Sequence, residues 1–318
     1  MQDTANVHAV IQEFLVWKNN PVIIIRWATA TGKTSLSLDI ADRFPVEIIG
    51  ADSRQLFRGM DIWTDKISID IRKKIPHHQI DIINPDEHYT AWQWKFATEE
   101  LIADIHRRWK IPVIAWWTWL YIDTIYKNFS MPEISPDYIL RQKLYDKEEQ
   151  TPGILGKELY AIDPEEANKH HPNSVRYIVR ALEIYHISGK TKTELFTSRP
   201  PRRPLLMIGL WREKDDTNKR INKRIHEMFD EGLVEEVQWL LDAWYSSELQ
   251  SMQWIGYKEV VEYIQWTIDR EKCEELMKKN THYLAKKQRT WFRRYIADSK
   301  INTNKDISFQ TFILDSAL

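Results

Sequence analysis

The chain has 318 residues, with 45 Lys or Arg against 46 Asp or Glu, so its formal net charge is −1. This balance excludes a protein that binds nucleic acid through its overall charge, and any basic surface must be local. The single cysteine, Cys273, excludes an internal disulfide framework and is typical of a reducing compartment. No apolar run is long enough to span a membrane, and residues 1–20 lack the layout of a signal peptide, so we expect a cytoplasmic protein with no membrane partner.

The first part of the chain alternates apolar strands with helices. We expect strands at 22–25, 46–49 and 111–115, with residues 76–82 continuing the core, and helices at 1–20, 35–43, 90–108 and from residue 120 onward. Strands that alternate with helices favour a mostly parallel sheet flanked by helices, and hence an α/β fold.

From about residue 132 the pattern changes to charged amphipathic helices, which we expect at 136–149, 156–160, 164–170 and 174–188. A proline-rich linker at 198–204 then leads to a strand at 205–210 and to helices at 217–242, 258–266 and 273–296. We predict four segments: the first part of the α/β core at 1–131, an inserted helical domain at 132–203, the completion of the core at 204–300 and a peripheral tail at 301–318.

The first strand leads into a phosphate-binding pattern. The run Trp27-Ala28-Thr29-Ala30-Thr31-Gly32-Lys33-Thr34 matches the P-loop pattern G-x-x-x-x-G-K-[ST], except that Trp27 stands at the first glycine. Gly32 lets the backbone approach an anion, Lys33 supplies a positive charge, and Thr34 offers its hydroxyl to Mg²⁺. Nucleotide-binding and ATP-binding proteins share this pattern, but alone it predicts only a phosphorylated ligand. It makes the predicted fold a P-loop NTPase-like core.

Two other strand ends carry candidate site residues. Asp52 follows the second strand, at the sheet edge where open α/β sheets place ligands, and its carboxylate can accept a proton or hold Mg²⁺. Capping of the following turn is the alternative role of Asp52. The run Trp116-Trp117-Thr118-Trp119 follows the strand at 111–115. With glycines in place of tryptophan it would bring Thr118 to a ligand, and as written it would form an aromatic cluster that could stack on bases.

Tryptophan is over-represented and glycine is under-represented. The chain has 15 Trp and 9 Gly, whereas the usual glycine frequency of ~7% predicts about 22 glycines. Some bacterial genetic codes read the codon UGA as glycine, and another common code reads it as tryptophan. Our hypothesis is that many of these tryptophans are glycines of a gene translated with the wrong code. A genuinely tryptophan-rich protein is the alternative.

These features together resemble the tRNA dimethylallyltransferase family, also called tRNA isopentenyltransferases. The resemblance runs from about residue 21 to 296 and rests on the P-loop, the run 52–64, Pro76-His77-His78 with Asp81, and later stretches at 171–190, 220–237, 252–259 and 286–294. The family pattern has tryptophan at Trp291 and glycine at Trp27, Trp63, Trp92, Trp109, Trp116, Trp117, Trp119, Trp244 and Trp254. It leaves five tryptophans unassigned: Trp17, Trp94, Trp211, Trp239 and Trp266.

The resemblance implies an enzyme that transfers a dimethylallyl group from dimethylallyl diphosphate to N6 of the adenine beside the tRNA anticodon. It implies that Asp52 is the general base and that Lys33, Thr34 and Mg²⁺ stabilise the leaving diphosphate, with Thr34 as the metal ligand. The diphosphate would be bound by residues 27–34 and Arg220. Contacts to the tRNA anticodon stem-loop would come from Asp52, Ser53, Arg54, Gln55 and Thr118 in the core and from Arg141, Arg176 and Arg180 in the inserted domain. We expect a monomer.

Three alternatives stay open. Transfer to a free adenine nucleotide, as by an adenylate isopentenyltransferase, would need no RNA-clasping insertion. A small-molecule kinase would not need the two motifs downstream of the P-loop. A catalytically impaired RNA-binding homologue follows if the tryptophans are real, because indoles at Trp27 and at 116–119 would fill the phosphate site.

Overall fold

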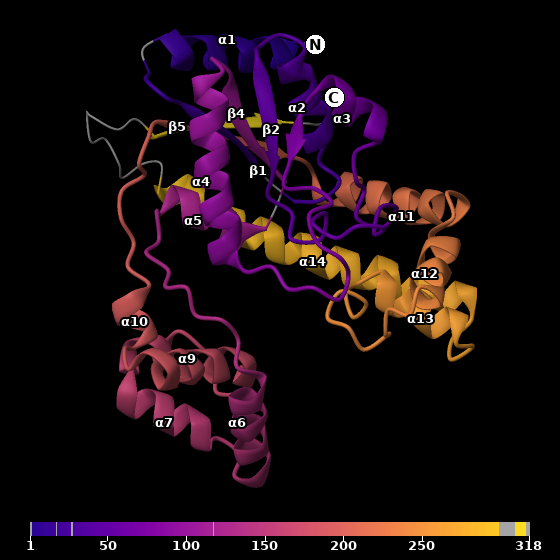
Figure 1. Ribbon diagram of the computed structural model, residues 1–318. Helices are drawn as coiled ribbons and strands as arrows, with labels where there is room; N and C mark the ends of the chain where they lie inside the picture. The colour runs from indigo at the N-terminus through magenta and orange to yellow at the C-terminus, as the bar shows by residue number, and fades with distance from the viewer. Residues whose placement is uncertain (1, 17, 27, 117, 299–308, 316–318) are drawn as a thin grey trace. The chain divides into compact units, whose positions relative to one another are not determined.

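The structure is a computed structural model, and it describes residues 2–16, 18–26, 28–116, 118–298 and 309–315 (Figure 1). The chain divides into two compact units, one formed by residues 1–126 and 201–318 and the other by residues 127–200. The second unit therefore begins five residues before, and ends three residues before, the inserted domain expected at 132–203. Within the described residues, no helix is both long and apolar enough to cross a membrane.

A six-stranded parallel sheet forms the centre of the first unit, with the strand order β3-β2-β4-β1-β5-β6. All five residues of β1 are buried, as expected for a parallel strand that is covered on both faces. The order places β1 between β4 and β5, and it places β4 between β1 and β2. The strands are β1 (Val22–Arg26), β2 (Val46–Gly50), β3 (His77–His78), β4 (Ile111–Ala115), β5 (Leu205–Trp211) and β6 (Phe309–Asp315).

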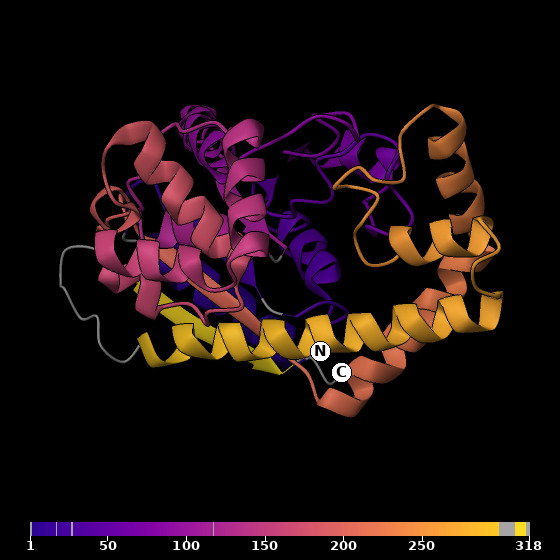
Figure 2. The same cartoon turned by 90° about the horizontal axis from the view of Figure 1, so that it is seen from below.

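Helices pack around this sheet (Figure 1). Helix α2 contacts β1, β2 and β4, and α4 contacts β4. Figure 2 shows α14 as one long helix that runs past the core, where it packs against α11 and α13. The helices of this unit are α1 (Gln2–Val16), α2 (Lys33–Ala41), α3 (Ile69–Lys74), α4 (Ala91–Arg107), α5 (Trp119–Tyr126), α11 (Lys214–Asp230), α12 (Leu233–Asp242), α13 (Tyr257–Ile264) and α14 (Arg270–Asp298).

The second unit is helical and has its own small apolar core, formed by Leu144, Leu155, Leu159, Ile178, Val179, Ala181 and Leu182. Leu155 and Leu159 lie four residues apart, as do Ile178 and Leu182, so each pair projects from one face of its helix into this core. The helices are α6 (Tyr138–Gln150), α7 (Ile154–Ile162), α8 (Pro164–Asn168), α9 (Val175–Ser188) and α10 (Lys192–Leu195).

Two expectations from the sequence were wrong. The single helix expected at 217–242 is two helices, α11 and α12. Gly232 takes the left-handed conformation (φ 99°) and interrupts the helix between them. The expected peripheral tail at 301–318 contains a strand, β6, which pairs along its whole length with β5 at the edge of the sheet. Polar residues within this segment hid its strand pattern.

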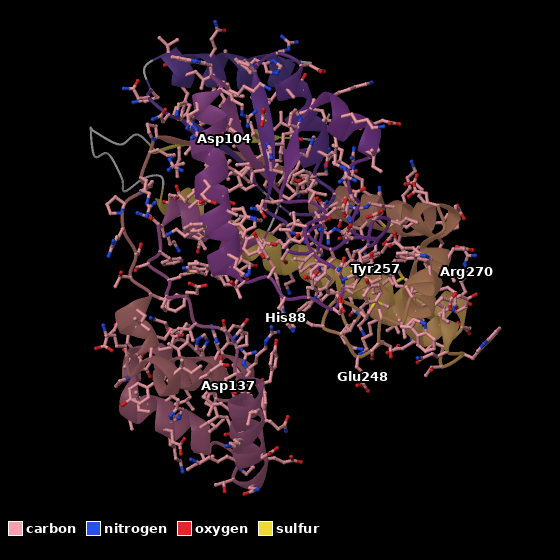
Figure 3. The ribbon with its side chains drawn as sticks, in the orientation of Figure 1. His88, Asp104, Asp137, Glu248, Tyr257 and Arg270 are labelled. Atoms are coloured by element: carbon pink, nitrogen blue, oxygen red, sulfur yellow. The ribbon has the colours of Figure 1, made fainter. Side chains whose placement is uncertain are left out.

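A buried carboxylate ties β2 to the end of α4. The Glu47 side chain is fully buried and accepts hydrogen bonds from Arg108 and from Lys110 (2.9 Å), and its Oε2 lies 2.7 Å from His78 Nε2. Arg108 also pairs with the exposed Asp104 of α4 (Figure 3). Burial raises the pKa of Glu47, but the hydrogen bonds from Arg108, His78 and Lys110 outweigh it and lower the pKa to about 2.

We expect Glu47 to stabilise the fold above pH 5 and to lose this contribution as the pH falls toward 2. The folded-state pKa of about 2 lies below the ordinary value of 4.5, so the unfolded chain binds the proton first and the loss amounts to about 3 kcal/mol. Urea unfolding at several pH values should show the gap between the unchanged chain and Glu47→Gln narrowing by that amount. The exposed control Glu100→Gln should show the same pH dependence of the free energy of unfolding as the unchanged chain. A difference between the unchanged chain and Glu47→Gln that stays constant with pH would contradict this account.

Candidate active site

Three loops meet at one edge of the sheet because three parallel strands end there. Ala115 at the end of β4 pairs in register with Ile25 of β1 and with Gly50 of β2. The Ala51 N–H donates to the Ala115 carbonyl, and the Thr118 N–H donates to the Ala51 carbonyl, both at 2.8 Å. The loops that follow β1, β2 and β4 therefore lie together, as the strand ends in the sequence predict.

The loop after β1 closes on itself around Ala28. The Lys33 ammonium donates to the Ala28 carbonyl at 2.6 Å, and the Thr31 hydroxyl donates to the same oxygen at 2.9 Å. Gly32 has φ 97° and leads directly into α2, a conformation that a side chain would strain. Its position gives the amides at the start of α2 access to an anion. The predicted roles of Trp27 and Trp117 fall outside the described residues.

Lys33 is a buried cation with a shifted proton affinity. Its side chain is almost fully buried, and desolvation lowers its pKa to about 8, although the nearby Asp52 carboxylate opposes this shift. A buried ammonium without a bound anion is therefore close to losing its proton, and a negatively charged ligand would restore its charge.

Asp52 is the second residue after β2 and is also buried. Its Oδ1 accepts a hydrogen bond from the Arg54 N–H at 2.9 Å, which is the turn-capping contact weighed as its alternative role. The next residue is held by the loop after β4, because the Ser53 N–H donates to the Thr118 hydroxyl oxygen at 2.9 Å. The side chains of Lys33 and Asp52 line one common cavity.

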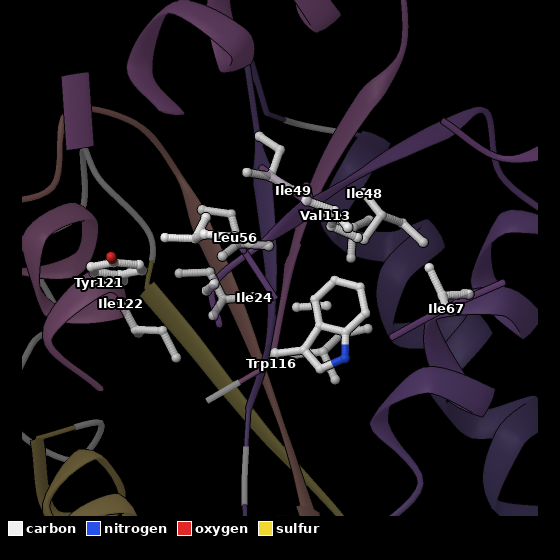
Figure 4. Packing of buried hydrophobic residues seen from close by; sticks show 14 of the residues in the cluster. Ile24, Ile48, Ile49, Leu56, Ile67, Val113, Trp116, Tyr121 and Ile122 are labelled. Atoms are coloured by element: carbon white, nitrogen blue, oxygen red, sulfur yellow. The ribbon is translucent and has the colours of Figure 1, made fainter. Parts of the chain in front are cut away.

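This cavity has a volume of about 650 Å³, and all of its lining residues belong to the first unit. The P-loop contributes one wall, the loop after β2 a second and helix α11 a third. The residues that the sequence predicted and the cavity brings together are Thr29, Ala30, Gly32, Lys33, Thr34, Asp52, Arg54, Gln55 and Arg220. Trp63 and Trp116 also line the cavity, and Trp116 packs with the apolar cluster that includes Ile24 and Val113 (Figure 4). The cavity therefore persists beside both indoles.

The wall formed by residues 61–65 is anchored from α12. Glu236 accepts hydrogen bonds from the N–H groups of Asp61 (2.8 Å) and Ile62 (2.7 Å), and it accepts one from the Tyr257 hydroxyl at 2.8 Å (Figure 3). The buried Gln55 amide then donates to the Thr64 carbonyl at 2.9 Å. The bonds from Asp61 and Ile62 to Glu236 join segments that are 175 and 174 residues apart in sequence, so no local pattern reveals them.

The sequence analysis missed one residue that lines the cavity and one residue that holds the P-loop. Arg224 of α11 lies one turn from Arg220, lines the cavity and pairs with Asp65 at 3.3 Å. Gln288 of α14 is buried, and its Oε1 accepts a hydrogen bond from the Thr29 N–H of the P-loop at 2.9 Å. The Nε2 group of Gln288 has no hydrogen-bond partner among the described residues. Helical spacing from Arg220 would have found Arg224, whereas no local signal indicates Gln288.

The three arginines expected to contact RNA lie in the second unit. Arg141 forms a two-pronged ion pair with the buried Glu183 (2.8 and 2.9 Å), and Arg180 pairs with the same carboxylate and donates to the Ile134 carbonyl. Arg176 is exposed. The structure thus gives Arg141 and Arg180 a role inside this unit, and their contact with RNA stays a prediction.

A left-handed glycine precedes a buried lysine at the start of a helix and at the carboxyl edge of a parallel sheet, and this arrangement defines an α/β protein with a P-loop NTPase-like core. The family model described as IPP transferase matches residues 55–295. Curated tRNA dimethylallyltransferases agree with it. The protein of Thermotoga neapolitana is 41% identical over 272 residues, covering 86% of this chain and 89% of its own length. The protein of Halothermothrix orenii is 42% identical over 289 residues, covering 89% of this chain and 87% of its own length.

Solved structures agree as well. A tRNA isopentenylpyrophosphate transferase from Bacillus halodurans matches with a TM-score of 0.65 at 33% identity, covering 94% of this chain and 92% of its own. A eukaryotic dimethylallyltransferase, described as acting on tRNA, matches with a TM-score of 0.73 at 29% identity, covering 92% and 74%. The chain belongs to the IPP transferase family.

The charge of Lys33 should make diphosphate binding weaken above pH 8. Below its pKa of about 8 the ammonium is charged, and above it the unliganded protein must take up a proton to bind. We expect the ratio of the Kd for inorganic diphosphate of Lys33→Met to that of the unchanged chain to shrink as pH rises from about 7 to about 9, measured by calorimetry. The control is Lys223→Met, which changes an exposed residue at the rim of the cavity. The ratio of its Kd to that of the unchanged chain should stay constant with pH. A constant ratio for Lys33→Met as well would refute the role of the Lys33 charge.

Gln288 should hold the P-loop in its binding geometry. Gln288→Met keeps the size of the side chain but removes a neutral hydrogen bond, which is worth roughly 1 kcal/mol, so we expect about a fivefold weaker affinity for inorganic diphosphate. Lys286→Met, an exposed change on the same helix, should alter this affinity less than about twofold. Equal effects of both substitutions would show that Gln288 does not position the loop.

Proposed function

We propose that this chain transfers a dimethylallyl group from dimethylallyl diphosphate to N6 of the adenine beside the tRNA anticodon, with release of diphosphate. The observation that carries the proposal is the cavity that a P-loop lysine and a buried aspartate both line, at the ends of the two strands that flank β4. The cationic wall can stabilise the negative charge of the leaving diphosphate, and the carboxylate can accept the proton of the acceptor amine. The particular reaction is inferred from the family to which the chain belongs.

The P-loop side of the cavity would stabilise the departing diphosphate. Lys33, the amides at the start of α2 and Arg220 from α11 all line this side, and each can neutralise charge that develops on the phosphate oxygens. An allylic carbon tolerates positive charge as its bond to oxygen breaks. Leaving-group stabilisation is therefore the main contribution that these residues make to the rate.

The β2 side of the cavity would bind and activate adenine. The exocyclic amine of adenine is a poor nucleophile, and Asp52 can take its proton as the new carbon–nitrogen bond forms. Arg54 and the buried Gln55 lie beside Asp52 on this wall, where their side chains can meet the edge of the base. The target base must leave its stack to reach the cavity, as in other enzymes that modify bases.

Mg²⁺ fits the P-loop side. Thr34 is the first hydroxyl of α2 and lines the cavity, and Mg²⁺ sites in phosphate-binding proteins combine one or two protein oxygens with phosphate oxygens and water. The described residues hold no cluster of three or more acidic, His or Cys side chains that would form a metal site without the substrate. We therefore assign Thr34 as the protein ligand of Mg²⁺ that arrives with the diphosphate. The ion would supply further charge neutralisation.

The helical unit at 127–200 is proposed to hold the anticodon stem, with exposed Arg176 as a phosphate contact and with Arg141 and Arg180 shaping the same helices through Glu183. The acceptor is RNA rather than a free nucleotide, because the relatives that cover most of this chain are named for tRNA.

The impaired-homologue alternative is disfavoured, because the cavity remains between Trp63, Trp116 and the P-loop. We propose that the protein acts as a cytoplasmic monomer, and ATP binding, which the P-loop pattern allows, has no role in this reaction.

Transfer to RNA can be measured directly with radiolabelled dimethylallyl diphosphate and an anticodon stem-loop. We expect label in the stem-loop with adenine beside the anticodon, and none when guanine replaces that adenine. Asp52→Asn should lower the single-turnover rate by roughly 100-fold or more while the affinity for dimethylallyl diphosphate changes little, because it removes the base but leaves the P-loop.

The exposed control Asp70→Asn should leave both the rate and the affinity unchanged, since its side chain is remote from the cavity. Label transferred to AMP faster than to the stem-loop would replace this proposal with the nucleotide acceptor. No transfer to either acceptor, with intact diphosphate binding, would support the impaired homologue.

A further inference from the structure

Tryptophan occupies an unusual share of the left-handed backbone positions. Ten described residues other than glycine have a positive φ, and four of them are the residues most tolerant of it, Asn or Asp. Four more are tryptophans: Trp109 (φ 58°), Trp116 (φ 87°), Trp244 (φ 68°) and Trp266 (φ 58°). A bulky side chain is strained in this conformation, whereas glycine adopts it without cost.

Three of these tryptophans end helices in the same hydrogen-bonded motif. After α4, the Trp109 N–H donates to the His106 carbonyl at 2.9 Å, and the Lys110 N–H reaches back to the Ile105 carbonyl at 3.1 Å. This pair of bonds is the Schellman motif, whose left-handed residue is usually glycine.

The same two bonds recur at the other two helix ends. After α12, Trp244 bonds to Leu241 at 3.0 Å and the following N–H to Leu240 at 3.2 Å. After α13, Trp266 bonds to Tyr263 at 3.0 Å and the following N–H to Glu262 at 2.9 Å. Three separate helix ends thus place an indole at the position where the motif favours glycine.

The indoles at these ends gain nothing from the fold. Trp109 is 90% exposed, Trp244 is 94% exposed and Trp266 is 91% exposed, so each combines a strained backbone with an unburied apolar ring. Trp116 differs because its ring is buried in the cavity wall, yet its φ of 87° directly after β4 is also a glycine conformation.

Trp94 shows what a structurally required tryptophan looks like in this chain. It lies within α4, is fully buried, stacks on Tyr121 with ring centroids 4.6 Å apart, and donates from its indole nitrogen to the Gly50 carbonyl at 2.9 Å. Its ring fills space and satisfies a backbone acceptor, and a glycine could do neither.

We propose that positions 109, 116, 244 and 266 are glycine in the protein that its own cell makes, and that Trp94 is tryptophan there. Their codons would then be UGA, read as glycine in that cell, whereas the codon of Trp94 would be UGG. The assignment adds Trp266, which the sequence pattern left open, and separates Trp94 from the same unassigned group. It does not depend on the proposed reaction.

Thermal unfolding tests the structural half of this proposal. Trp109→Gly, Trp244→Gly and Trp266→Gly should each raise Tm by roughly 2–4 °C, because each relieves a left-handed side chain without losing buried surface. Ala243→Gly and Gln265→Gly are matched controls, since each precedes one of these tryptophans with an ordinary negative φ. The controls should lower Tm, and a similar decrease for the tryptophan variants would overturn the proposal.

Mass spectrometry of the protein purified from its own cells tests the identity itself. Trypsin releases residues 259–270 with Trp266 as their single tryptophan, and residues 75–95 with Trp94. We expect the first peptide at the mass for glycine at 266 and fragmentation of the second to show tryptophan at 94. Tryptophan at 266, or glycine at 94, would overturn the assignment.

Discussion

The placement of β4 between β1 and β2 is the constraint on which the site depends. Because both neighbours pair with β4 in register at Ala115, the P-loop and the Asp52 loop end at one level and face one cavity. The buried Asp52 is then close enough to the buried Lys33 to raise the pKa of this lysine, against the lowering by desolvation. A buried charge is unfavourable without a partner. The sheet order therefore creates a site that is most stable when an anion pairs with Lys33 and a hydrogen-bond donor pairs with Asp52.

The remaining parts of the site come from distant segments that hold these two loops in place. Gln288 of α14 restrains the P-loop through Thr29, and Glu236 of α12 restrains the loop at 61–65 through two backbone N–H groups. Helix α11 adds Arg220 and Arg224 to the wall opposite the sheet. The segments after residue 201 therefore do more than complete the sheet, because they line part of the cavity and supply part of its positive charge.

Sequence reasoning succeeded where the signal was local. The strand at 111–115 was predicted with its observed limits, and the P-loop was recognised although Trp27 breaks its first position. It failed where the deciding interaction was a single left-handed residue, as at Gly232, or a pairing between distant segments, as between β5 and β6. Gln288 could not be assigned a role for the same reason. It accepts a hydrogen bond from the Thr29 N–H, which lies 259 residues away in the sequence. The tryptophan anomaly was visible in composition, but only the structure distinguishes Trp266 from Trp94, by backbone angle and by burial.

A crystal structure with Mg²⁺ and an unreactive thio analogue of dimethylallyl diphosphate would test the central claim most directly. The account predicts that the diphosphate contacts Gly32, Lys33 and Thr34, that Mg²⁺ binds the Thr34 hydroxyl, and that the allylic carbon lies on the side of the cavity that faces Asp52. A diphosphate bound only by Arg220 and Arg224, with the allyl group directed away from Asp52, would contradict the division of the cavity into a leaving-group side and a base side.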